Sequence, residues 1–93
     1  MTTVLILFRV ANFDEWRPRY DDALERTIGV KSAQVLRGQD DPDQVVIAEV
    51  FESREAARAA LSVPGLQDEM AADGVDLSSV RVEFLDDASR IER

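Results

Sequence analysis

The segment from Thr3 to Val10 is rich in aliphatic and aromatic residues, and it is predicted to form a strand. Side chains alternate between the two faces of a strand, so one face carries Val4, Ile6, Phe8 and Val10 and the other carries Leu5 and Leu7. Both faces therefore need cover. The helices predicted below suffice for one face only, so we expect a second copy of the chain to cover the other.

A helix is predicted directly after this strand. Asn12 is a suitable cap, and Asp14 and Glu15 would lie in the first turn, where the helix dipole favours negative charge. Pro18 cannot donate a backbone hydrogen bond, so we expect an irregular first turn or a kink there. Gly29 ends the pattern. The apolar stripe, at spacings of three and four, consists of Phe13, Trp16, Tyr20, Ala23, Leu24 and Ile28.

Two further strands are predicted over residues 30–39 and 44–52. They are separated by residues 40–43, Asp-Asp-Pro-Asp, which are typical of a turn. If the loop has these four residues, Val35 lies opposite Ala48 in the hairpin.

The rest of the chain predicts a second helix and a last strand. Ser53 is a suitable cap for the helix, which ends before Pro64. Its buried stripe is Ala56, Ala57, Ala60 and Leu61. Pro64 begins a short extra helix that Gly74 closes, and residues 80–87 form the last strand. Residues 88–93 are expected to be a frayed tail.

This order of elements predicts one ferredoxin-like α+β domain over residues 1–87. Its βαββαβ arrangement has a four-stranded antiparallel sheet with two helices on one face. The helix-facing set is expected to be Val4, Ile6, Phe8, Ala33, Val35, Val46, Ala48, Val50, Val80, Val82 and Phe84. The opposite set is Leu5, Leu7, Arg9, Ser32, Gln34, Leu36, Val45, Ile47, Glu49, Phe51, Arg81, Glu83 and Leu85. This mixed face favours a homodimer in which sheet packs on sheet.

Composition excludes several classes of function. The net charge of −8 disfavours nucleic acid and anionic membrane surfaces as partners. The chain has neither cysteine nor histidine, which argues against disulfides, thiolate or histidine nucleophile chemistry, common zinc sites and haem held by histidine. Asp40, Asp41 and Asp43 lack the ligand spacing of a calcium loop, so we expect no metal and no cofactor.

Two features concern location. No apolar run approaches the roughly 20 residues that a membrane helix requires. The amino terminus has no basic segment followed by an apolar stretch and a cleavage site. We therefore expect a cytoplasmic protein.

Several short motifs point to one family. They are Phe13-Asp14-Glu15-Trp16, Gly29-Val30, Val35-Leu36-Arg37, the run from Asp40 to Val46, Phe51-Glu52-Ser53 with Glu55-Ala56-Ala57, and Met70 before Gly74-Val75. On these motifs, nearly the whole chain resembles the dimeric α/β-barrel superfamily. Within it, the chain is similar to small bacterial proteins near the antibiotic-biosynthesis monooxygenases, often labelled cyclases. The motifs mark the fold more than the chemistry.

The resemblance implies a barrel formed by two facing sheets, with ligands between each sheet and its helices. Superfamily members include cofactor-free oxygenases of polycyclic aromatics, haem-degrading enzymes, and isomerases or dehydratases. The absence of histidine argues against the histidine-dependent branches. The aromatic-polyketide oxygenases are likened to a mechanism that uses asparagine, tryptophan and arginine. Only Trp16 can be placed, because the sole asparagine is the predicted cap, so no catalytic residue is carried over.

Trp16 and Tyr20 lie one helical turn apart and are open to two interpretations. They could line an aromatic pocket between helix and sheet, with the phenol as a hydrogen-bonding or acid group. Alternatively, they are part of the apolar core, as most helical stripes are.

The expected barrel face carries four charged residues: Arg9, Glu49, Arg81 and Glu83. They could form ion pairs within or across the dimer. Alternatively, Arg9 or Arg81 binds a carboxylate or enolate while Glu49 removes a proton. Ser32 and Gln34 would then orient the ligand.

Two functions from different classes fit this sequence. One is a metal-free, cofactor-free enzyme, monooxygenase- or cyclase-like, acting on a small hydrophobic or aromatic molecule. The other is a noncatalytic small-ligand-binding or assembly module. The enzyme requires a cavity beside Trp16 and Tyr20, or beside Glu49, with a polar group directed into it. Residues 62–79 would be a rim or lid of such a site, or only a surface connection.

Overall fold

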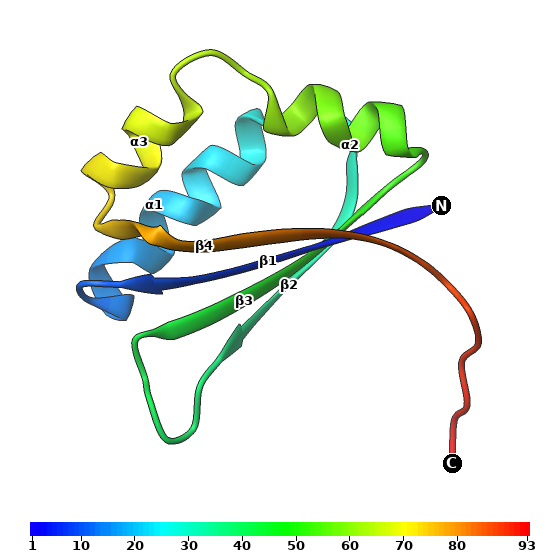
Figure 1. Ribbon diagram of the computed structural model, residues 1–93, viewed down its shortest axis with the longest axis horizontal. Helices are drawn as coiled ribbons and strands as arrows, with labels where there is room; N and C mark the ends of the chain where they lie inside the picture. Colours follow the sequence, from blue (N-terminus) through cyan, green and yellow to red (C-terminus); the bar gives the residue numbers. More distant parts are fainter.

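The structure is a computed structural model that describes all residues, Met1–Arg93. Its elements are β1 (Thr2–Val10), α1 (Phe13–Arg26), β2 (Val30–Arg37), β3 (Gln44–Phe51), α2 (Arg54–Leu61), α3 (Leu66–Ala72) and β4 (Val75–Asp86). The strands form one antiparallel sheet in the order β2-β3-β1-β4. In Figure 1 α2, α3 and most of α1 lie above the sheet, and no helix covers the face below it. The predicted ferredoxin-like α+β fold is confirmed, with α3 as the short third helix.

Local capping explains where the two longer helices begin. The Asn12 side-chain oxygen accepts a hydrogen bond from the Glu15 amide at 3.1 Å, and the Ser53 hydroxyl accepts one from the Ala56 amide at 3.1 Å. Helix α1 continues through Pro18 to Arg26. None of the helices has the length and apolar character needed to cross a bilayer.

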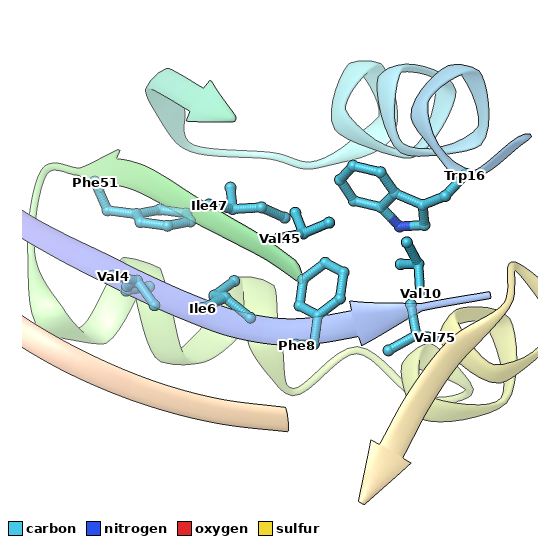
Figure 2. Packing of buried hydrophobic residues seen from close by; sticks show 10 residues of the cluster. Val4, Ile6, Phe8, Val10, Trp16, Val45, Ile47, Phe51 and Val75 are labelled. Atoms are coloured by element: carbon cyan, nitrogen blue, oxygen red, sulfur yellow. The ribbon is translucent and has the colours of Figure 1, made fainter. Parts of the chain in front are cut away.

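The core lies between the upper face of the sheet and the helices (Figure 2). β1 supplies its centre, because every second side chain of this strand is buried. Trp16 reaches down from α1 onto the same layer, as Figure 2 shows. The complete buried apolar set is Val4, Ile6, Phe8, Val10, Trp16, Val45, Ile47, Phe51, Ala57 and Val75.

The hairpin register differs by one residue from the predicted one. Val35 lies opposite Ile47, not opposite Ala48. The cause is Gly38, whose amide donates to the Gln44 carbonyl at 2.9 Å and extends the pairing by one residue. A side chain there would clash with the Asp41 carbonyl oxygen, so the tight turn requires glycine.

This shift reverses the predicted faces of β3, because a slip of one residue moves every side chain to the other face. Val45, Ile47, Glu49 and Phe51 are buried under the helices, opposite the side we predicted. The sequence prediction was therefore wrong for every residue of this strand. The residues of β3 that face away from the helices are Val46, Ala48 and Val50.

The last strand also begins earlier than predicted. β4 starts at Val75 and not at Val80, so the irregular stretch after α2 is shorter than expected. The pairing of β4 with β1 has a register shift between Leu7 and Arg9. At this shift the Arg9 amide donates a hydrogen bond to the Ser79 hydroxyl at 2.9 Å. Residues 87–93 carry no regular structure.

The uncovered face of the sheet carries one charged residue fewer than the sequence predicted. Glu49 lies on the helix side. On the uncovered face, β3 presents Val46, Ala48 and Val50 where the sequence predicted Val45, Ile47, Glu49 and Phe51. We define the open face by its apolar members: Leu5, Leu7, Leu36, Val46, Ala48, Val50 and Leu85. All of them are partly or fully exposed in the single chain.

Candidate functional site

Three aromatic side chains form a continuous wall between α1 and β1. Trp16, only 3% exposed, stacks on Tyr20 with ring centroids 5.1 Å apart and planes at 18°. Trp16 also contacts Phe8 edge-on, with centroids 5.4 Å apart, and the tilted ring of Phe13 at 5.7 Å. The spacing of one helical turn between Trp16 and Tyr20 produces this stack.

Glu49 lies against this aromatic wall. Its side chain is on the helix side of β3 and is 6% exposed, so our expectation that it belongs to the barrel face was wrong. The Tyr20 hydroxyl donates a hydrogen bond to Glu49 Oε2 at 2.7 Å. The two candidate sites that the sequence kept apart, Trp16 with Tyr20 and Glu49, are thus a single site.

The local environment favours the protonated form of both acids. Burial raises the pKa of Glu49 above its ordinary value, while the hydrogen bond from Tyr20 acts in the opposite direction. Burial raises the pKa of Tyr20 as well, and the hydrogen bond to Glu49 and its charge add to this effect. The phenol therefore stays protonated at neutral pH and is a donor. Glu49 is the group in the site suited to accepting a proton.

A cavity of about 110 Å³ opens beside this pair. Twelve of its sixteen lining residues are hydrophobic, which gives it an apolar wall with few polar groups. The lining consists of Ile6, Phe8, Trp16, Tyr20, Ala23, Leu24, Thr27, Ile47, Glu49, Ala60, Leu61, Leu66, Glu69, Met70, Asp73 and Val75.

The Glu49 carboxylate is part of the lining of this space. Oε2 accepts the hydrogen bond from Tyr20, and Oε1 has no hydrogen-bond partner in the protein. The structure contains no fully enclosed side-chain polar atom without a partner, so Oε1 keeps some accessible surface. A ligand in the cavity would find a carboxylate oxygen free to accept a hydrogen bond or a proton.

Two more carboxylates line the cavity, Glu69 from α3 and Asp73 directly after it. Glu69 forms an ion pair with Arg26 at 2.7 Å, and Asp73 lies 4.0 Å from Arg19. These arginines come from α1, so the pairs link the two helices over the cavity. The acidic groups do not form a cluster that could hold a metal ion. They leave the site without a free cation, which disfavours anionic ligands.

The other predicted site residues lie away from the cavity. Arg9 forms an ion pair with Asp41, which was not among the predicted partners, and Arg81 forms one with Glu83 at 3.5 Å. Gln34 lies opposite Ala48 on the open face. None of these residues lines the cavity, so the structure does not bring them together with Trp16, Tyr20 and Glu49.

Sequence reasoning missed several lining residues. Ile47 was assigned to the wrong face, and Glu69 and Asp73 were not singled out. A signal for these residues was available in the sequence. Leu66 and Met70 are four residues apart, and so are Glu69 and Asp73, which places each pair on one side of a helix.

The raised pKa of Glu49 predicts a stability change on Glu49→Gln. Folding favours protonated Glu49, so its contribution is complete below the unfolded pKa of about 4.3 and is lost as pH rises through the higher folded value. Glutamine keeps an acceptor for Tyr20 without the charge. We expect thermal unfolding at pH 7.5 to shift up by about 4 °C or more, and the shift to shrink toward pH 4.

The control for that experiment is Glu25→Gln, which removes one charge from an exposed position of α1. Its melting temperature should change little at either pH. Equal shifts for both variants would assign the effect to net charge, and a Glu49→Gln variant less stable at pH 7.5 would contradict the burial argument.

Comparison with known proteins agrees with this fold. A variant of SnoaB, a cofactor-independent oxygenase from Streptomyces nogalater, superposes with a TM-score of 0.76 at 18% identity, covering 99% of this chain and 97% of that one. Rv0793 from Mycobacterium tuberculosis superposes with a TM-score of 0.67 at 21% identity, covering 95% and 98%. At these identities the likeness concerns the fold. No curated protein matches the chain.

The sequence profile described as "Antibiotic biosynthesis monooxygenase" matches residues 1–72, which is more than half of the chain. The chain therefore belongs to the antibiotic biosynthesis monooxygenase family. The matched residues include β1, α1 and β3, which supply the aromatic wall and Glu49.

Proposed function

We propose that this protein is a cofactor-independent oxygenase in which Glu49 is the catalytic base. Its substrate is a small aromatic ketone, or the corresponding enol, with a benzylic CH₂ group that the carbonyl makes acidic. The observation that carries the proposal is the buried Glu49 carboxylate, which accepts a hydrogen bond from Tyr20 and lines an aromatic-walled cavity. SnoaB, described as a cofactor-independent oxygenase, supports it by its similar fold.

In the first step, Glu49 takes a proton from the benzylic carbon. A carboxylate with a raised pKa is a stronger base than a solvated one, and a nearby apolar wall excludes water from the transfer. The resulting carbanion carries its charge mainly on the carbonyl oxygen as an enolate. The Tyr20 ring, which is stacked on Trp16 and lies in the cavity lining, offers an aromatic surface that the substrate would contact.

Molecular oxygen supplies the oxidising power. The carbanion passes one electron to O₂ and the two radicals combine, so a carbon–oxygen bond forms. The peroxide takes back the proton that Glu49 accepted. Loss of water from this hydroperoxide breaks the O–O bond and leaves a carbonyl. In sum, CH₂ and O₂ give C=O and H₂O, and no other reductant or oxidant is needed.

Tyr20 acts as a positioning residue in this scheme. Its hydroxyl holds Glu49 Oε2 and so fixes the orientation of the carboxylate in the cavity lining. Because the pKa of Tyr20 is raised, the phenol does not compete with Glu49 as a base at neutral pH.

The proposal predicts oxygen consumption with 2-tetralone and with anthrone, which are two- and three-ring ketones with a benzylic CH₂. An oxygen electrode and chromatography should report one O₂ used for each dione or quinone formed, above the rate without protein. No metal or reductant should be required. If both compounds bind without oxygen uptake, the result would favour a noncatalytic ligand-binding module instead.

We also propose that two chains pair through the open face to form a homodimer. Leu5, Leu7, Val46, Ala48 and Val50 leave a continuous apolar surface on one side of the sheet. Burying such a surface against a second sheet removes apolar area from water, which favours association. The cavity lies on the other side of the sheet and would remain available in the dimer.

A further inference from the structure

The cavity beside Glu49 is small for an aromatic substrate. Its volume of about 110 Å³ is below the roughly 150 Å³ of an engineered protein cavity that holds one benzene molecule. Most small-molecule pockets have about 300 Å³ or more. Any substrate larger than a single ring must therefore extend beyond this cavity, and two mainly hydrophobic hollows border it.

One direction leads under α3 toward β4. A hollow of about 280 Å³ lies there, and we refer to it as the β4 hollow. It shares Ile6, Leu61, Leu66 and Met70 with the cavity, so the two spaces are separated only by apolar side chains. Its remaining walls are Leu77, Val80 and Val82 of β4 and Gln67 of α3, which is its single polar residue.

The second direction leads between α1 and α2. The hollow there has about 430 Å³ and shares Ala23, Thr27, Ala60, Leu66 and Glu69 with the cavity. Its lining includes the ion pair between Arg26 and Glu69, which a ligand would have to desolvate. Desolvating a charged pair is costly, so an apolar group would gain less on this side despite the larger space.

The exposure of two apolar side chains of β4 also favours the β4 hollow over the hollow between α1 and α2. Leu77 is 41% and Val82 43% exposed, although both lie on the helix side of the sheet and line the β4 hollow. An apolar group in that hollow would cover this surface and gain the corresponding hydrophobic free energy.

We propose that the β4 hollow is a second, apolar subsite that binds the unreactive hydrocarbon part of the substrate. This inference rests on the proposed function, in which Glu49 holds the reacting end in the cavity. It predicts that substrates are elongated apolar molecules with one polar end, and that the residues of β4 determine their length.

The test uses two non-reacting ligands, 4-methylphenol and 4-hexylphenol, whose hydroxyl can donate to Glu49. They differ by five methylene groups, and each buried methylene is worth up to about fourfold in affinity. Ordering the chain offsets part of that gain, so we expect 4-hexylphenol to bind at least about tenfold more tightly. Calorimetry gives the affinities for every variant, and in the original protein the fluorescence of Trp16, its only tryptophan, reports occupation of the cavity.

Two tryptophan variants decide which hollow holds the chain. Val82→Trp fills the β4 hollow, and Ala59→Trp fills the hollow between α1 and α2 from an exposed position of α2. We expect Val82→Trp to remove the tenfold preference while 4-methylphenol binds within about twofold of the original protein. Ala59→Trp should change neither affinity. Leu77→Trp provides a second blocking variant should Val82→Trp fail to fold.

The outcomes separate this inference from the proposed function. Loss of the preference in Ala59→Trp, or its survival in both β4 variants, would overturn the subsite. Equal binding of the two phenols to the original protein would also overturn it. If the preference follows the prediction but 2-tetralone and anthrone are not oxidised, the subsite stands and the proposed chemistry fails.

Discussion

Replacing Glu49 by glutamine is expected to lower turnover of 2-tetralone and anthrone by about 10²- to 10⁴-fold, which is the usual contribution of a general base. Glutamine has almost the same shape and can still accept the hydrogen bond from Tyr20. It cannot take a proton from carbon at neutral pH. Oxygen uptake at saturating substrate measures the effect as a loss of kcat.

The loss should be chemical and not structural. The variant is expected to be at least as stable as the original protein at pH 7.5, because it removes a buried charge. Binding of 4-methylphenol should change by only a few fold. Glu25→Gln on the exposed face of α1 serves as the control and should keep full activity. A Glu49→Gln variant that retained a third or more of the activity would remove Glu49 from the mechanism.

In the same assay, Tyr20→Phe separates the positioning role of Tyr20 from the proton transfer by Glu49. The hydrogen bond from Tyr20 lowers the pKa of Glu49, so its removal should raise that pKa. Turnover requires ionised Glu49 and falls as pH decreases through its pKa. The acid limb of the pH profile should therefore move to higher pH in Tyr20→Phe, with a smaller loss at high pH than Glu49→Gln causes.

Aspartate at two adjacent positions of β3 is expected to give opposite results. Ile47 is 2% exposed in the core, so Ile47→Asp buries an unpaired charge and removes packing, which together cost about 4 kcal/mol or more. That is a large part of the stability of a domain of this size, about 5–15 kcal/mol. Circular dichroism should show a largely unfolded protein or a melting temperature lower by about 15 °C or more.

Val46→Asp changes the open face and leaves the core intact. The folded chain should persist, and the dimer should dissociate. Light scattering should report twice the 10.4 kDa chain mass for the original protein and a single chain mass for the variant. Gln67→Glu, which adds a charge at an exposed position of α3, should remain dimeric.

The pair of variants tests the register of the hairpin as well as the dimer. With Val35 opposite Ala48, as the sequence predicts, Ile47 would lie on the open face and the two results would be exchanged. A single chain mass for the original protein would refute the dimer, whatever the variants do.

The candidate site was partly accessible from sequence. The helical spacing of Trp16 and Tyr20 was sufficient to place both on the inner side of α1, where the two rings stack and line the cavity. The position of Glu49 was not accessible, because a charged residue in an alternating strand ordinarily indicates the solvent side. The structure instead buries it and satisfies it with the Tyr20 hydroxyl.

The hairpin shows why the register could not be predicted. Both sets of alternate residues in β3 are compatible with a core: Val45, Ile47 and Phe51 on one side and Val46, Ala48 and Val50 on the other. Hydrophobic pattern fixes register only where one side is clearly polar. The register is instead set by Gly38, whose backbone hydrogen bond to Gln44 extends the β2–β3 pairing by one residue.

The sequence by itself determined the order of the elements, their caps at Asn12 and Ser53, and the burial of alternate residues in β1, because these depend on neighbours in the chain. Only the tertiary structure decided that Glu49 meets Tyr20 and that β4 begins at Val75. Both depend on pairing between distant segments, where a shift of one residue exchanges the two faces of a strand. That exchange placed a carboxylate inside the cavity.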